Sequence, residues 1–235
     1  MYNTNKSFSI MSLTIGFVVF VLTVFTSSVS AVDLPFDPTD YNFLIYSPYP
    51  GNDYITDAME HLGIHNYDVR NPTNPVTPTD IASHDILIVG WNANGNTNGL
   101  ISKDLLAGIT GRIILTGHDV DFHIVLDVED AQTFLINAIN YVLTGSGTGL
   151  ITLGDYLNTF PYLPREWGVS AQISDGEDID EITAEGLASG VYDGLDHNDM
   201  SDWSGTYHNK FTINSGSLFV PFELGGTNIA NCHYL

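Results

Sequence analysis

The stretch Asp85-Ile86-Leu87-Ile88-Val89-Gly90 decides the fold of this 235-residue chain. Its four central residues are all apolar and leave no polar face, which is typical of a strand buried on both sides within a parallel sheet. A glycine follows at once, as a sharp turn after a strand favours. The stretch therefore predicts a sheet that is covered by helices on both faces.

The segments on either side of this strand alternate between strand and helix. Further buried strands are predicted at residues 42–47, 66–70, 112–116 and 149–153, and helices at 53–61, 102–107 and 129–143. Residues 71–78 are predicted as a loop and residues 79–83 as a short turn. This alternation predicts an α/β fold with a doubly wound, mostly parallel sheet over residues 32–155.

The C-terminal part of the chain has a weaker pattern. An acidic run at 175–185 overlaps a predicted short helix at 181–187, and two short strands are predicted at 211–213 and 218–222. No linker of flexible composition separates this part from the preceding core. We therefore predict that residues 156–235 are an elaboration of the same domain, which completes the sheet or covers one of its edges.

The N-terminus has the pattern of an export signal. Lys6 precedes an apolar run from Ile10 to Phe25, and small residues follow as far as Ala31. Residues 1–31 are therefore predicted to be a cleaved signal peptide, and the mature chain to be secreted or periplasmic, with no membrane contact after cleavage. A retained signal anchor is the alternative interpretation, because flanking residues could lengthen the apolar run.

The charge of the chain restricts its partners. It has 28 acidic residues against 6 Lys and Arg, a formal net charge of −22. Cleavage after Ala31 would leave 204 residues with 5 basic and 28 acidic side chains, a net charge of −23. Such a surface repels nucleic acid and anionic membranes, so a neutral or cationic partner is expected. The single cysteine, Cys232, excludes an internal disulfide.

One turn concentrates side chains that can do chemistry. Ligands of open parallel sheets bind beyond the carboxyl ends of the strands, and the strand at 112–116 leads into Gly117-His118-Asp119-Val120-Asp121-Phe122-His123. One interpretation makes His118 a general acid or base that Asp119 or Asp121 orients. A second makes His118, Asp121 and His123 ligands of a divalent metal ion. A third is a polar turn whose Asp residues cap the next helix and whose His residues are partly exposed.

Two other segments are predicted to contact a ligand. Trp91 and Asn92 open a loop of Asn and Gly residues that could hydrogen-bond a neutral sugar, and a flexible turn without a ligand is the alternative interpretation. The lack of Lys excludes a phosphate loop. His197 and His208 would approach His118 if the C-terminal part folded over the carboxyl edge of the sheet. Trp203 could stack on a sugar ring, although we favour a place in the core. The predicted partner is a neutral carbohydrate or a cell-surface component.

The order of these segments resembles a known family. Residues 85–92, the Asn and Gly loop, the next helix and Gly111-Arg112-Ile113-Ile114-Leu115-Thr116-Gly117-His118 are similar to the ThuA-like branch of the class I glutamine amidotransferase-like superfamily. The resemblance covers roughly residues 42–155 and implies a flavodoxin-like, amidotransferase-like sheet. His118 stands where true amidotransferases have their nucleophilic cysteine, so glutaminase activity is not expected. ThuA-like proteins are associated with carbohydrate metabolism, which implies sugar chemistry at His118.

Two hypotheses follow for the function. The first is an exported, acidic amidotransferase-like module that binds a ligand or has a structural role at the cell exterior and is not an enzyme. The second is an extracytoplasmic hydrolase or carbohydrate-active enzyme that uses His118 with Asp119 or Asp121, with or without a divalent metal ion. Convergence of the His residues in one pocket, with a carboxylate behind an imidazole, would favour the enzyme.

Overall fold

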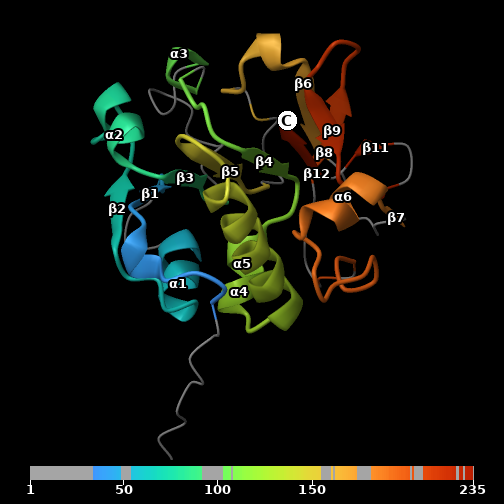
Figure 1. Cartoon of the computed structure of the whole chain (residues 1–235), viewed down its shortest axis with the longest axis horizontal. Coiled ribbons are helices and arrows are strands. Elements are labelled where there is room, and N and C mark those ends of the chain that lie inside the picture. Colours follow the sequence, from blue (N-terminus) through green and yellow to red (C-terminus); the bar gives the residue numbers. More distant parts are fainter. Residues whose placement is uncertain are drawn as a thin grey trace, which may run out of the picture. The chain divides into compact units, whose positions relative to one another are not determined.

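The computed structural model describes residues 34–48, 54–91, 103–106, 108–154, 160, 162–173, 181–201, 203, 209–225, 228–229 and 231–234 (Figure 1). The predicted signal peptide, the Asn and Gly loop, the acidic run as far as residue 180 and His208 lie outside these residues. All described residues belong to one compact unit, which spans residues 31–235. Within the described part of the chain, no helix is both long and apolar enough to cross a membrane.

Five parallel strands form the centre of the main sheet. They are β1 (Phe43–Tyr46), β2 (Tyr67–Arg70), β3 (Ile86–Val89), β4 (Ile113–Thr116) and β5 (Gly149–Thr152), in the order β2-β1-β3-β5-β4. Every residue of β1, β3, β4 and β5 is buried, which explains why their sequences have no polar face. The predicted doubly wound α/β fold is confirmed. Relative to the flavodoxin order 2-1-3-4-5, the last two strands are exchanged.

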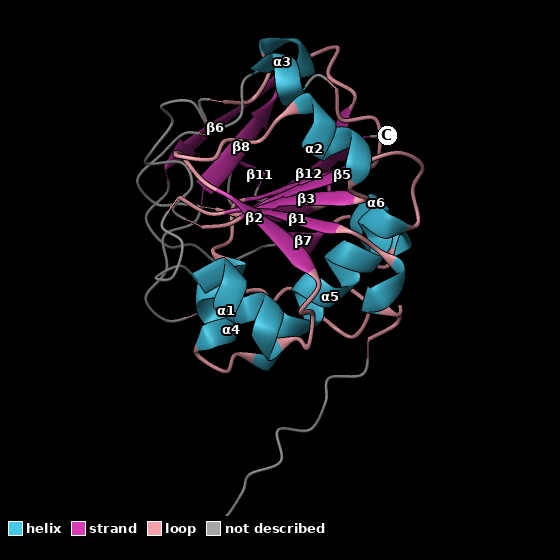
Figure 2. Ribbon diagram, turned by 90° about the vertical axis from the view of Figure 1, so that its left-hand side faces the viewer, coloured by secondary structure: helices cyan, strands magenta, loops and turns pink. Residues whose placement is uncertain are grey.

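Helices cover both faces of this sheet (Figure 2). One face carries α1 (Tyr54–His61), α4 (Val120–Val125) and α5 (Glu129–Leu143), and the other carries α2 (Pro78–Ser83) and α3 (Lys103–Leu106). Alternate residues of a strand enter the two cores: Phe43 and Ile45 face α1 and α5, whereas Leu44 and Tyr46 face α2 and α3.

The side on which each helix lies follows from the direction of its crossover. The connections from β1 to β2 and from β4 to β5 run toward the β2 edge and carry α1, α4 and α5. The connections from β2 to β3 and from β3 to β4 run the other way and carry α2 and α3. If every crossover between parallel strands is right-handed, the helices must lie on these faces. The chain therefore leaves the carboxyl edge toward opposite faces after β1 and after β3, and we call the place between these strands the first switch point. After β5 the chain continues with Phe160 in the core of α2 and α3, whereas β4 is followed by α4 on the other face, so the place between β5 and β4 is the second switch point.

The C-terminal strands extend the main sheet and form a second one. The remaining elements are η1 (Pro38–Asp40), η3 (Arg165–Trp167), β6 (Val169–Ile173), β7 (Glu181–Ile182), α6 (Ala184–Ser189), β8 (Asn209–Ile213), β9 (Phe219–Pro221), β10 (Glu223–Gly225), β11 (Asn228–Ile229) and β12 (Asn231–Tyr234). β12 pairs antiparallel with β4, and β9 pairs with β12. The second sheet has the order β6-β8-β11-β10-β7. The C-terminal part thus lies against the β4 edge, beside the candidate turn.

Two local predictions need correction. The turn predicted at residues 79–83 is the helix α2, whose first residue is Pro78. Thr77 and Asp80 form a capping box at its N-terminus, in which each side chain bonds to the backbone N–H of the other residue. The helix predicted near 181–187 begins only at Ala184, because Glu181 and Ile182 pair with β10 as β7.

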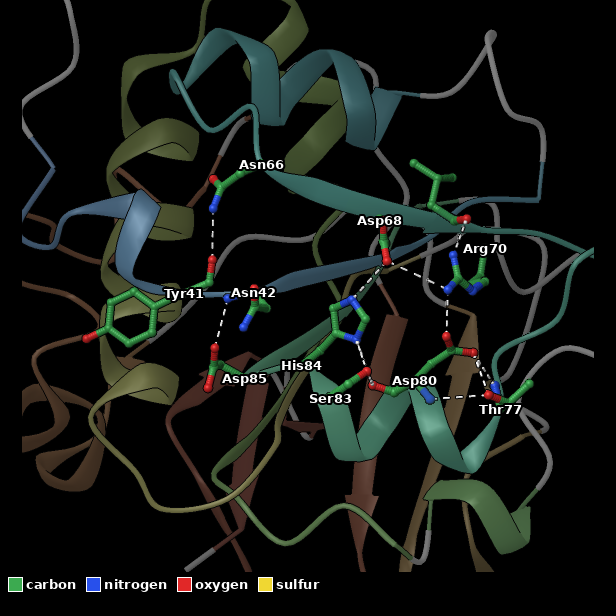
Figure 3. A network of polar contacts seen from close by, with 11 residues as sticks. Tyr41, Asn42, Asn66, Asp68, Arg70, Thr77, Asp80, Ser83, His84 and Asp85 are labelled. Atoms are coloured by element: carbon green, nitrogen blue, oxygen red, sulfur yellow. Dashed lines mark hydrogen bonds and ion pairs between the residues drawn. The ribbon is translucent and has the colours of Figure 1, made fainter.

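A polar network ties α2 to the edge strand β2 (Figure 3). Arg70 on β2 donates a hydrogen bond of 2.6 Å to Asp80 on α2, and Asp68 lies 3.7 Å from the same guanidinium and 3.3 Å from His84. The hydrogen bond from Arg70, with those from Thr77, lowers the pKa of Asp80 to about 2. The network therefore fixes the helix that brings the chain from β2 across to β3.

Replacing Arg70 by Met is expected to lower the free energy of unfolding by about 1 to 2 kcal/mol at pH 7. Because the folded pKa of Asp80 is depressed, this stabilisation is present above pH 4 and is lost as the pH falls toward 2. Urea unfolding of the protein and the variant at pH 7 and at pH 3 measures the difference. Arg165→Met, at an exposed arginine of η3, is the control and should change little. Equal effects at both sites would contradict the prediction.

Candidate functional site

The imidazole of His118 is completely buried and bound to the C-terminal part of the chain. It follows β4, and its Nε2 lies 2.8 Å from Oε2 of Glu223, which is also completely buried. Glu223 opens β10 and is 105 residues away in the sequence. The backbone N–H of His118 donates to Oγ1 of Thr116 over 3.0 Å. A carboxylate therefore does stand behind the imidazole, but the second sheet supplies it.

A second imidazole and carboxylate pair lies on α4. Nε2 of His123 is 3.4 Å from Oδ1 of Asp119, one helical turn earlier, and both residues are buried. The ring of Trp203 lies between the two pairs, with centroids 5.3 Å from the His118 ring and 5.2 Å from the His123 ring. Trp203 is 6% exposed and belongs to the core, as predicted.

The second switch point, beside His118, has no open space for a ligand between the described residues Gly154, which follows β5, and Gly117, which follows β4, because their backbones are in close contact and β8 packs against them. A Cβ atom on Gly154 would overlap the carbonyl oxygen of Gly117. The N–H of Gly154 donates to the carbonyl of His118 over 2.8 Å, and the N–H of Asn209 on β8 donates to the carbonyl of Gly117 over 2.9 Å. This close contact holds His118 within the packed interior.

The first switch point instead carries three partly exposed aromatic side chains, which we call the aromatic cluster: Tyr54, Trp91 and Phe122. They come from the connections that follow β1, β3 and β4. Trp91 and Phe122 stack with centroids 5.7 Å apart, and the ring of Tyr54 makes T-shaped contacts with them at centroid distances of 5.2 and 5.0 Å. Three connections thus bring aromatic rings together where open α/β sheets bind ligands.

Asp121 lies behind the aromatic cluster and is completely buried. Its Oδ2 accepts the backbone N–H of Trp91 over 2.9 Å, and its Oδ1 accepts the N–H of Phe122 over 3.2 Å. Burial, and to a lesser extent the nearby charge of Asp119, raises the pKa of Asp121 to about 8. The carboxyl group at this switch point is therefore mostly protonated at pH 7.

The structure separates the residues that were predicted to act together. The carboxylate at His118 is Glu223, whereas Asp119 pairs with His123 and Asp121 bonds to Trp91. His118 and His123 are buried, so the interpretation of a polar turn with partly exposed histidines is wrong. Asp119 is the N-cap residue of α4, but its side chain makes no capping hydrogen bond.

The other site predictions have mixed outcomes. No three His, Cys, Asp or Glu side chains among the described residues are placed to hold a metal ion, so the set His118, Asp121 and His123 is not assembled as a metal site. Trp91 lies in the aromatic cluster. His197 is exposed, whereas His118 is buried, and Asn92 and His208 lie outside the described residues.

Sequence reasoning missed three residues of these clusters. Tyr54 and Phe122 follow the carboxyl ends of predicted strands, so the switch-point rule could have found them. Glu223 carries no local signal, because it meets His118 only through the packing of β10 beside the turn.

Comparisons with known proteins give no relative: no family model, no curated protein and no solved structure matches the chain. The resemblance to the ThuA-like branch therefore stays a prediction. Function must be inferred from the geometry at the carboxyl edge of the sheet.

Proposed function

We propose that this chain is an exported, acidic amidotransferase-like module without glutaminase activity that binds a neutral carbohydrate at the first switch point. The aromatic cluster is the observation that carries the proposal. Tyr54, Trp91 and Phe122 are partly exposed at the carboxyl edge of the sheet, and aromatic rings offer flat apolar faces against which a sugar ring can stack.

The charge of the molecule supports a neutral ligand. A formal net charge of −22 opposes the approach of an anion. Immediately behind the aromatic cluster, the raised pKa of Asp121 leaves its carboxyl group uncharged at neutral pH, so it offers no ion-pair partner to a cation there. An uncharged polyhydroxylated ligand suits both conditions.

The buried histidines support binding over hydrolysis. A general acid or base must come within hydrogen-bonding distance of the reacting group. The His118 imidazole has no exposed surface and is bound to Glu223, and His123 is 1% exposed beside Asp119. Neither imidazole lies at the surface where a substrate would arrive.

The binding function is tested by screening the mature protein against neutral oligosaccharides and measuring the affinity of those that bind by calorimetry. Trp91→Ala is expected to weaken binding at least about tenfold, as loss of a central aromatic contact does. Trp167→Ala is the matched control, because Trp167 packs on Phe219 in the core beneath α2 and α3. This substitution should not change the affinity. Binding that Trp91→Ala leaves unchanged, or no binding by any oligosaccharide, would contradict the proposal.

The hydrolase alternative is tested on the same sample with a panel of glycosides and esters. No turnover is expected. Turnover that is lost in both His118→Ala and a folded His118→Gln variant would establish the enzyme instead, because Gln retains a hydrogen bond to Glu223 but cannot act as an acid or base at neutral pH.

A further inference from the structure

The buried side chain of Asp121 on α4 holds the first residue of the connection that follows β3. The N–H of Trp91 donates to Oδ2 of Asp121 over 2.9 Å, although the two residues are 30 positions apart and belong to different connections. The bond is made at the point where the chain leaves the sheet. It therefore sets the direction in which Trp91 departs from β3.

Gly90 makes this contact possible. A Cβ atom at this position would lie 2.6 Å from Cγ2 of Ile55 on α1 and 3.2 Å from Oδ2 of Asp121. The absence of a side chain thus lets α1 and α4 both approach the end of β3. These are the helices that carry Tyr54 and Phe122, so one close approach brings all three rings of the aromatic cluster together.

A carboxyl group is a costly choice for a completely buried position, because an apolar side chain would fill the space without loss of hydration. At this position Asp121 provides an acceptor for the backbone N–H of Trp91, which belongs to the aromatic cluster. Its oxygens bond to the backbone of Trp91 and Phe122, whereas the carboxylate partner of His118 is Glu223. Its geometry therefore serves the first switch point.

We propose that Asp121 is a positioning residue, which holds Trp91 against Phe122 and Tyr54 in the orientation that binds the ligand. This inference rests on the carbohydrate-binding function proposed above. A site held in this way is formed before the ligand arrives, so binding does not have to order the Trp91 side chain. Asp121 then contributes to affinity through Trp91 without touching the sugar.

The first test needs no ligand and uses the unaltered protein. Hydrogen exchange measured by NMR should show the Trp91 amide to be protected to the same degree as the amides of β3, because its hydrogen is bonded to a buried carboxyl. Rapid exchange at Trp91, with protection retained in β3, would overturn the proposal.

The second test compares Asp121→Asn, which keeps an acceptor for Trp91, with Asp121→Leu, which fills the space without one. Both are made with Trp167→Phe, so that Trp91 is the partly exposed tryptophan and Trp203 stays buried. Acrylamide should quench the fluorescence of Asp121→Leu about twofold more strongly, whereas Asp121→Asn should match the parent. Equal quenching of the two variants would contradict the role. If Asp121→Leu does not fold, Asp121→Ala replaces it.

The third test measures affinity for a neutral oligosaccharide that binds the unaltered protein. Asp121→Asn should bind within about threefold of it, and Asp121→Leu about tenfold more weakly, which corresponds to one lost hydrogen bond. A purely structural role would leave the affinity of the folded fraction unchanged in both variants, and that result would overturn the proposal. If no oligosaccharide binds at all, the binding function fails, and hydrogen exchange and quenching still decide the position of Trp91.

Discussion

Replacing Glu223 by Ala is expected to lower the free energy of unfolding by about 3 to 5 kcal/mol, because removal of one partner from a buried pair leaves the other without compensation. Glu223 and His118 have no exposed surface and are joined over 2.8 Å. The pair also connects β10 to the turn after β4, so its loss weakens the attachment of the second sheet to the main one. This is the largest loss expected from a single truncation in the candidate site.

Urea unfolding of the mature protein measures this effect. Glu223→Gln should recover most of the lost stability, since the amide has nearly the same shape and can still bond to the imidazole. Glu185→Ala, at an exposed position of α6, is the control and should stay within about 0.5 kcal/mol of the parent. If Glu223→Ala is no more destabilising than Glu185→Ala, the buried pair does not hold the C-terminal part in place.

The strands and the long helix could be predicted because their signals are local. The apolar run at residues 86–89 and the apolar face of residues 129–143 are properties of short segments, and β3 and α5 have these bounds. The helix α2 was missed although its signal is equally local, since Thr77 and Asp80 have the spacing of a capping box. The exchange of β4 and β5 could not be predicted, because the same alternation of elements is compatible with either order.

The pairings within the site depend on how far apart the partners lie in the sequence. The spacing of Asp119 and His123 is four residues, so a helix at this position would have predicted their contact. The partner of His118 could not be predicted, because Glu223 reaches it only through the arrangement of the second sheet. The sequence therefore singled out the turn and Trp91, but it paired His118 with Asp119 or Asp121, whereas the structure pairs it with Glu223.

Replacing Asp121 by Asn is expected to stabilise the protein at neutral pH and to have no such effect near pH 4. Burial raises the pKa of Asp121 to about 8 in the folded protein, against the ordinary value of 3.8 for an aspartate in an unfolded chain. Between these values the unfolded chain has lost a proton that the folded chain keeps, so stability falls as the pH rises through this window. Below this window the carboxyl group is protonated in both the folded and the unfolded chain. Above it the group is ionised in both, so the loss of stability no longer changes with pH.

Asn has no proton to lose and still accepts the N–H of Trp91, although it gives up the longer contact with Phe122. We therefore expect a gain on the order of 3 kcal/mol at pH 7 that shrinks toward zero at pH 4. Urea unfolding of both proteins at pH 4, 5.5, 7 and 8 measures it, with Asp193→Asn as the exposed control. A difference that does not change with pH would mean that Asp121 is already ionised in the folded protein. The aromatic cluster would then have a negative charge behind it, which would favour a cationic ligand over a neutral sugar.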